Sequence, residues 1–213
     1  MTPEQFYPYI RVDVPDCPDP VINANVVSAC IEFCRETLAW TEFQDFMPLF
    51  DGLVDYQIDV PAHSRLIQVM DVWLGSTRLI PLTMKDLQRV MPNWSDAIGS
   101  LPVYYTAAIE RGMIRLHPKP QNVTGQKLHL RIALVPSVGA RTLPDFLELH
   151  HFEAIASGAK ARLLNMAAAT WFNPQLAERH RQLFQEGINA ARIAEIHDRV
   201  PSTVSIQPRR FGF

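Results

Sequence analysis

The sequence predicts an α+β fold: mainly an α-helical bundle with an inserted small antiparallel β-module and an extended C-terminal tail. Apolar residues recur at three- and four-residue spacings near both ends of the chain, which is the period of an amphipathic helix. Short alternating or β-branched runs, separated by Gly, Pro and Asn, occupy the middle and indicate strands. Helical texture on both sides of a β-rich middle indicates that the β-module is inserted after the first helix of the bundle.

The longest helical segment covers residues 142–199. One stripe of this segment is apolar, so it needs a packing partner. The run Trp171-Phe172-Asn173-Pro174 interrupts the helical period once, with Asn173 placed to cap a second helix and Pro174 to open it. Thr142 is the expected N-cap of the first helix. Two helices joined by a short turn are expected to pack as an antiparallel hairpin.

Small side chains are concentrated in residues 154–161, within the first helix of this hairpin. Because such residues let another backbone approach closely, they predict tight helix packing, either within the subunit or between copies. The residues expected to pack between subunits are Ala154, Ser157, Gly158 and Ala161.

The N-terminal part divides into an arm and a helix. Residues 1–19 are rich in proline and acidic side chains, which excludes a long helix, and we expect them to form an arm. Asp19 and Pro20 mark a helix start, and the apolar face that follows carries to about Gln44. Cys30 and Cys34 lie one turn apart on that face and are expected to be buried thiols rather than metal ligands. The predicted helical bundle comprises residues 20–46 and 142–199.

The predicted β-module covers residues 47–141. Gly75-Ser76 and Arg111-Gly112 have the composition of hairpin turns. Residues 84–90 are expected to form a short helix, and Trp94 is the expected anchor of the loop that follows. The candidate strands are residues 54–60, 66–74, 77–82, 103–110, 113–117 and 127–135.

Residues 200–213 form the predicted C-terminal tail. This segment has no helical period and too little apolar content to fold alone, so it is either frayed or held by a partner. Two arginines beside two phenylalanines suit a docking peptide, because Arg and aromatic side chains often anchor interfaces. A terminus without a role is the alternative. The residues expected to dock are Val204, Ile206, Arg209, Arg210, Phe211 and Phe213.

Composition narrows the class of protein. A chain of 213 residues with 47% hydrophobic residues can bury a sizeable core. The formal net charge of −2 and a pI near 6.4 argue against a surface dominated by nucleic-acid binding, while leaving room for a local basic patch. The sequence has no apolar run of the roughly 18 residues that a membrane span requires. We therefore expect a soluble protein. Three cysteines in a chain of this size suit a reducing compartment, so we expect them to be free thiols.

Motifs that would indicate chemistry are weak. Glu148 and His151 have the Glu-x-x-His spacing of carboxylate-bridged di-metal bundles, which would place both side chains on one helix face, and Glu153 follows. Such sites need a second pair, which the sequence lacks, so hydrogen-bonding residues on a bundle or subunit surface are the preferred interpretation. Glycine-rich phosphate loops, a G-x-S-x-G elbow and a cysteine-nucleophile signature are missing too. We expect no cofactor, no metal and no catalytic residue.

Five segments follow the N-terminal helix in a fixed order. They are Tyr56-Gln57-Ile58-Asp59-Val60-Pro61, Ile114-Arg115-Leu116-His117-Pro118-Lys119-Pro120, Leu143-Pro144-Asp145-Phe146, Ala154-Ile155-Ala156-Ser157-Gly158-Ala159-Lys160-Ala161-Arg162-Leu163-Leu164 and Trp171-Phe172-Asn173-Pro174. Taken together, the order and the segments resemble the head-to-tail adaptor (connector) proteins of short-tailed bacteriophages. The resemblance covers about residues 21–199. It implies a helical bundle that carries a β insertion.

The resemblance also implies a structural role in the virion neck, between head and tail, for a protein made in the host cytoplasm. In that family many copies, typically twelve, form a ring beneath the portal protein and give a tail or nozzle protein its attachment surface. The implied partners are other copies of the chain, the portal, that tail protein, and DNA that passes through the lumen without sequence-specific binding. Neither a membrane nor a catalytic residue is implied. The family orders a C-terminal tail against the portal, in agreement with the predicted docking tail.

Alternative functions remain at this stage. Another neck or tail protein, such as a stopper or a tail completion protein, would bind tail components but never the portal. A metal-dependent enzyme would use Glu148, His151 and Glu153, and would retain a transition metal on purification. Cellular binding modules are a further class.

Overall fold

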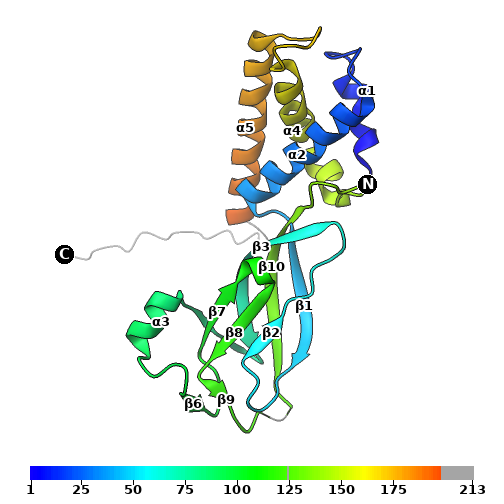
Figure 1. Ribbon diagram of the computed structural model, residues 1–213. Coiled ribbons are helices and arrows are strands. Elements are labelled where there is room, and N and C mark those ends of the chain that lie inside the picture. The colour runs from blue at the N-terminus through cyan, green and yellow to red at the C-terminus, as the bar shows by residue number, and fades with distance from the viewer. Residues whose placement is uncertain (124, 198–213) are drawn as a thin grey trace, which may run out of the picture.

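The computed structural model describes residues 1–123 and 125–197. The molecule is elongated, with the long helices at one end and the strands, together with the short helix α3, at the other (Figure 1). The helical elements are η1 (Pro3–Phe6), α1 (Tyr7–Ile10), α2 (Asp19–Thr37), α3 (Met84–Val90), η2 (Ile109–Arg111), α4 (Asp145–Leu164) and α5 (Pro174–His197). The strands are β1 (Thr41–Pro48), β2 (Asp55–Gln57), β3 (Ser64–Leu74), β4 (Thr77–Arg78), β5 (Ile80–Pro81), β6 (Ile98–Gly99), β7 (Tyr104–Ala108), β8 (Met113–His117), β9 (Lys119–Pro120) and β10 (Lys127–Pro136).

A single hydrophobic cluster holds the helical end together. α2, α4 and α5 contribute to it, so segments from both sides of the β-rich middle share one core. Phe6, Ile10 and Val14, which precede α2, are fully buried in the same cluster. The Phe6 ring stacks on that of Phe152 in α4, with 4.5 Å between the ring centroids. The predicted arm is therefore packed on the helices, because its apolar side chains find partners there.

The first long helix is shorter than the sequence predicts. α2 begins at Asp19, as expected, but ends at Thr37, well before Gln44. The Thr37 hydroxyl donates a hydrogen bond to the Phe33 carbonyl at 2.8 Å, and Leu38 turns the chain with a left-handed φ of 55°. Strand β1 follows. The prediction of helix up to Gln44 is therefore wrong, because a left-handed residue ends the helix.

The hairpin of α4 and α5 has the predicted break. α5 opens at Pro174, and the Asn173 side chain accepts a hydrogen bond from the Leu176 amide at 3.1 Å, as a helix cap does. The start of α4 differs from the prediction, because its N-cap is Pro144 rather than Thr142.

The β-rich end contains two four-stranded sheets and one two-stranded sheet. Their strand orders are β1-β10-β3-β4, β2-β8-β7-β5 and β6-β9. The long pairings of β10 with β1 and β3 are antiparallel, whereas the short pairs β5–β7 and β6–β9 are parallel. The long helices α2, α4 and α5 and the mainly antiparallel sheets occupy separate ends of the molecule, which confirms the predicted α+β class.

Every predicted run in the middle of the chain contains at least one strand, and α3 has the predicted bounds. Gly75, with φ 59°, lies in the turn between β3 and β4, as expected. Arg111 and Gly112 belong instead to a longer connection, in which η2 precedes Gly112 at φ 61°. Trp94 anchors the loop after α3 by an edge contact with the His117 ring, at 5.6 Å between ring centroids.

A second hydrophobic cluster fills the β-rich end, and Trp40 packs against both clusters at their junction. Cys30 and Cys34 are buried free thiols in the helical cluster, and burial raises the pKa of Cys34 to about 12. None of the helices that the structure describes combines the length and the apolar content needed to cross a bilayer.

Candidate interaction surface

The α4–α5 hairpin brings two helix backbones unusually close. A Cβ atom added at Gly187 of α5 would overlap the Cβ of Ala154, and one added at Gly158 of α4 would lie 2.8 Å from the Phe184 ring. Real Cβ atoms do not tolerate such separations, so the absence of side chains at both glycines sets the spacing of the two helices. The small residues of this segment thus serve packing within the subunit.

The residues predicted to pack between subunits fall on different parts of the hairpin. Ala154 and Gly158 contact α5 of the same chain. Ser157 is half-buried and lines an open groove, and Ala161 is half-buried. Their role in contacts between copies stays a prediction.

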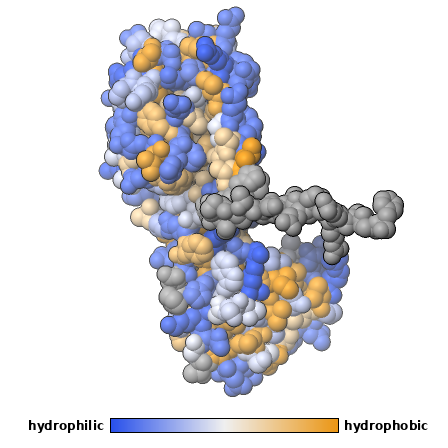
Figure 2. Space-filling model, turned by 180° about the vertical axis from the view of Figure 1, so that it is seen from behind, coloured by the Kyte–Doolittle hydropathy of each residue, from blue (hydrophilic) through white to orange (hydrophobic). Residues whose placement is uncertain are grey.

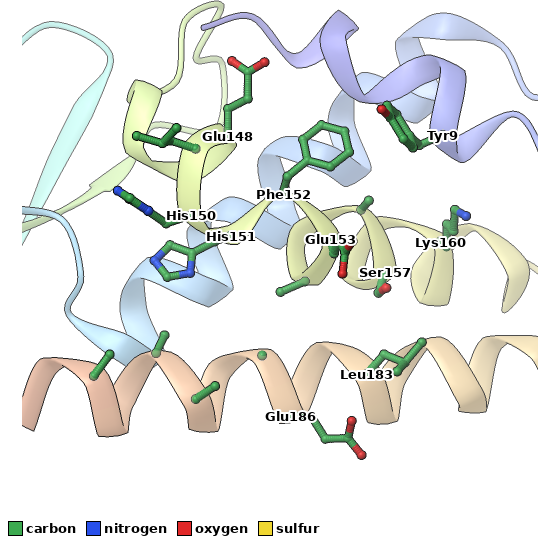
Figure 3. Close-up of a pocket in the computed structure, with 17 residues that line it drawn as sticks. Tyr9, Glu148, His150, His151, Phe152, Glu153, Ser157, Lys160, Leu183 and Glu186 are labelled. Carbon is green, nitrogen blue, oxygen red and sulfur yellow. The ribbon is translucent and has the colours of Figure 1, made fainter.

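The open groove, called here the α4–α5 groove, has a volume of about 1060 Å³ and runs along the outer side of the hairpin (Figure 3). Its base is made largely of small side chains, and Tyr9 of α1 closes one side. The lining residues are Tyr9, Glu148, Leu149, His150, His151, Phe152, Glu153, Ala154, Ala156, Ser157, Lys160, Leu183, Glu186, Gly187, Ala190, Ala191 and Ala194.

A kink in α4 shapes the wall of this groove. His151 has non-helical backbone angles, with φ −132° and ψ 15°. Glu148 and His151 consequently point to opposite sides of α4, as Figure 3 shows. The Glu148 carboxylate accepts a hydrogen bond from the Gln5 amide at 3.3 Å, away from the imidazole. The expectation that both side chains share one helix face is therefore wrong, since the helix on which it depends is interrupted.

The His151 imidazole lies among aromatic rings. Its centroid is 4.6 Å from that of Phe33 and 6.2 Å from that of Phe146. Burial, and to a smaller extent the neighbouring His150, lower the pKa of His151 below its usual range. Desolvation disfavours the charged form of an imidazole, so His151 is a neutral packing residue near pH 7.

The described residues contain no group of three or more His, Cys, Asp or Glu side chains that could hold a metal ion. Glu153 is exposed on α4 at the edge of the groove. The suggested trio Glu148, His151 and Glu153 is thus dispersed, and its oxygen and nitrogen atoms do not converge on one point.

Three ionisable groups tie the N-terminal segment to the hairpin. Asp13 pairs with Lys160 of α4 at 2.6 Å and approaches His180 of α5 at 3.4 Å. Burial is the main reason that the pKa of His180 is lowered, followed by the charge of Lys160, against the opposing effect of Asp13. We interpret this cluster as structural, because the Asp13 carboxylate is already paired with Lys160.

A second surface lies at the other end of the molecule, around α3. Large apolar side chains are exposed there, and Figure 2 shows apolar residues gathered over the lower part of the β-rich end. We call residues 80–103 the α3 lobe. Its exposed apolar residues are Ile80, Met84, Val90, Ile98, Leu101 and Val103.

Sequence reasoning missed both the groove and the exposure of the α3 lobe. The groove is built from α1, α4 and α5 together, so no local pattern marks it. The sequence does contain a signal for the lobe, because α3 has apolar residues on more than one side. In the structure only Leu87 of α3 is buried, so the others are left exposed or half-buried. The predicted docking residues from Val204 to Phe213 lie outside the described residues.

Comparison with known proteins gives one family. The family model described as SU10 adaptor protein matches residues 10–207, which is nearly the whole chain. A search of curated proteins finds no match.

Proposed function

Because the chain belongs to the SU10 adaptor protein family, whose role is that of a structural head-tail adaptor in the neck of a phage virion, we propose that it forms a ring that joins portal to tail. The ring would contain twelve copies of one subunit and belong to a short-tailed phage. Its upper side would contact the portal protein, and its lower side a tail or nozzle protein. DNA would pass through the lumen without sequence-specific binding.

The family match over residues 10–207 is the observation that carries this proposal. The shape of the subunit supports it. A ring requires two different, complementary surfaces on each subunit, because each copy contacts its two neighbours through unlike patches. The α4–α5 groove at the helical end and the exposed α3 lobe at the β-rich end are two unlike surfaces of this kind.

We further propose that different segments of the chain make different contacts in the assembled neck. The helical unit, with residues 1–19 packed on it, would supply contacts between copies, in which Ser157 and Ala161 take part beside the intrachain contacts of Ala154 and Gly158. The β-rich insertion would project from that unit. The tail, residues 200–213, would dock on the portal through Val204, Ile206, Arg209, Arg210, Phe211 and Phe213.

The test is assembly with purified portal protein, followed by native mass spectrometry and electron microscopy. We expect a complex in which a closed ring of this chain, with twelve copies, caps one side of the portal. Because assembly can depend on the portal, a monomer in the absence of portal is compatible with the proposal. Binding to tail proteins but not to portal would contradict it and would assign the chain to stoppers or tail completion proteins.

A further inference from the structure

The α4–α5 groove has an acidic edge and an apolar base. Glu153 of α4 and Glu186 of α5 are exposed, and neither makes an ion pair with any side chain in the part of the chain that the structure describes. Lys160, the cation among the lining residues, is already paired with Asp13 at 2.6 Å. The groove therefore offers uncompensated negative charge around a base of alanine and glycine.

Helix α3 of the lobe carries charge of the opposite sign. Lys85 and Arg89 of α3 are exposed, and Met84 and Val90 beside them are 42% and 50% exposed. Arg89 shares its charge with Asp86 at 3.1 Å, whereas the ammonium of Lys85 has no carboxylate partner among the described residues. Helix α3 thus presents apolar side chains with a net charge of +1, from Lys85 and Arg89 against Asp86, while Asp96 in the loop that follows makes the lobe as a whole neutral. Exposed apolar patches with a charged border commonly mark protein interfaces.

The dimensions of the two surfaces agree. A helix of the length of α3, Met84–Val90, is about 10 Å long at the usual rise per residue. The groove follows α5 from Leu183 to Ala194, about 18 Å by the same rise, and its volume is about 1060 Å³. A small base of alanine and glycine lets a second helix approach closely, as it already lets α4 and α5 approach each other.

We propose that the α3 lobe of one copy of this chain seats in the α4–α5 groove of the next copy, with Lys85 and Arg89 facing Glu153 and Glu186. The inference rests on the proposed ring and names the surfaces that close it. Because groove and lobe lie at opposite ends of the elongated subunit, neighbours overlap lengthwise, helical end on β-rich end (Figure 1). The contact is heterologous, as a closed ring requires.

Charge reversal on each surface tests the contact. The lobe variant carries Lys85→Glu and Arg89→Glu, and the groove variant carries Glu153→Lys and Glu186→Lys; all four positions are exposed, so both variants are expected to fold. Each variant alone places like charges across every contact. We expect the subunit concentration for half-maximal ring formation on portal to rise about tenfold for each, with the effect weakening at high salt.

The decisive measurement is the mixture of the two variants. In a ring of alternating subunits each reversed lobe meets a reversed groove and each normal lobe meets a normal groove, so every contact again joins opposite charges and assembly recovers to near the wild-type level. The matched control, Arg65→Glu with Arg141→Glu, reverses two exposed arginines outside both surfaces and should leave assembly within about twofold. Circular dichroism confirms folding of each variant.

The outcomes separate this inference from the proposed function. If wild-type rings form on portal but the mixture assembles no better than its components, the lobe-in-groove contact is wrong and the adaptor role stands. Loss of assembly in the lobe variant without recovery in the mixture would assign the lobe to the portal or to a tail protein instead. If the wild-type chain forms no ring and binds no portal, both proposals fall.

Discussion

At the scale of single residues, His151 shows how packing overrides sequence spacing. Its ring lies between Phe33 and Phe146, and its backbone leaves the helical region. The neighbouring Phe152 stacks on Phe6 at 4.5 Å. Aromatic contacts on both sides of the kink hold α4 in its interrupted form. The imidazole is consequently a half-buried packing group, with an electrostatic cost if it takes up a proton.

Acidification should destabilise the chain in part through this residue. The pKa values of His117, His151 and His180 are all lowered in the folded chain, mainly by burial. The unfolded chain therefore binds more protons just below pH 6.5, so these residues leave stability intact above that pH and reduce it as the pH falls from 6.5 toward their lower folded pKa values. His151→Phe keeps an aromatic ring and removes one titrating group.

We expect urea unfolding curves to show a shallower decline in unfolding free energy between pH 7 and pH 5 for His151→Phe than for the wild type. The two other histidines remain in the variant, so the decline is reduced rather than abolished. Identical pH dependence in both proteins would contradict a buried neutral imidazole at position 151.

At the scale of elements, steric contacts set the distance between α4 and α5. Gly187 faces Ala154, and Gly158 faces Phe184. Neither Gly187 nor Ala154 has a side-chain torsion angle whose rotation could relieve a clash between them. The helix pair is thus sensitive to single methyl groups.

Gly187→Ala should lower the free energy of unfolding. Overpacking costs about 1–3 kcal/mol, and the better helix propensity of alanine recovers about 1 kcal/mol at most. Adding Ala154→Gly removes the opposing methyl and should restore much of the loss, so the double-mutant cycle reports a favourable coupling. Gly139→Ala is the control, because a Cβ at Gly139 meets no atom within 4 Å.

Chemical denaturation of the four proteins in the cycle, together with the control, gives the required free energies. Additive losses for Gly187→Ala and Ala154→Gly would show that the helices separate freely at this point. That result would also weaken the claim that these small residues serve packing inside the subunit.

Most elements could be predicted from the sequence, since local patterns specify them. The strands β3, β8 and β10 and the start of α5 follow from alternation and from the Asn173 cap. β1 was missed because Trp40, Phe43 and Met47 have three- and four-residue spacings that continue the helical period of α2. The end of α2 lacks the usual glycine, since Leu38 takes the left-handed conformation.

The candidate surfaces were harder to predict than the elements. Small residues in α4 indicate close packing, but the sequence does not say whether the partner belongs to the same chain. The groove needs the relative placement of α1, α4 and α5, which arises only from tertiary contacts such as that of Phe6 with Phe152.

At the scale of the whole molecule, two hydrophobic clusters meet at Trp40. The Trp40 carbonyl accepts a hydrogen bond from the Leu134 amide at 2.9 Å, which ties the end of the helical unit to β10. Both clusters are formed by residues of the described part of the chain. The sequence of residues 200–213 has too little apolar content to fold alone, so we expect the two cores to form without it.

Deleting residues 200–213 should leave the free energy of unfolding within about 0.5 kcal/mol of wild type and weaken binding to portal. Phe211→Ser with Phe213→Ser in the full-length chain is the milder companion variant and should weaken binding in the same direction. Thermal denaturation and titration with purified portal measure the two effects. An unfolded truncated protein, or unchanged portal affinity, would contradict the docking role of the tail.

The strands that lead out of the helical end and back into it are next to each other, with Thr41 of β1 opposite Ala133 of β10. A few residues would therefore bridge the gap if everything between these two positions were removed. The β-rich end therefore enters and leaves the helical end at adjacent positions, and could be exchanged as one unit. Exchange of this insertion would leave the hydrophobic cluster of the helical half largely in place, because that cluster is built mainly from α2, α4, α5 and the segment before α2.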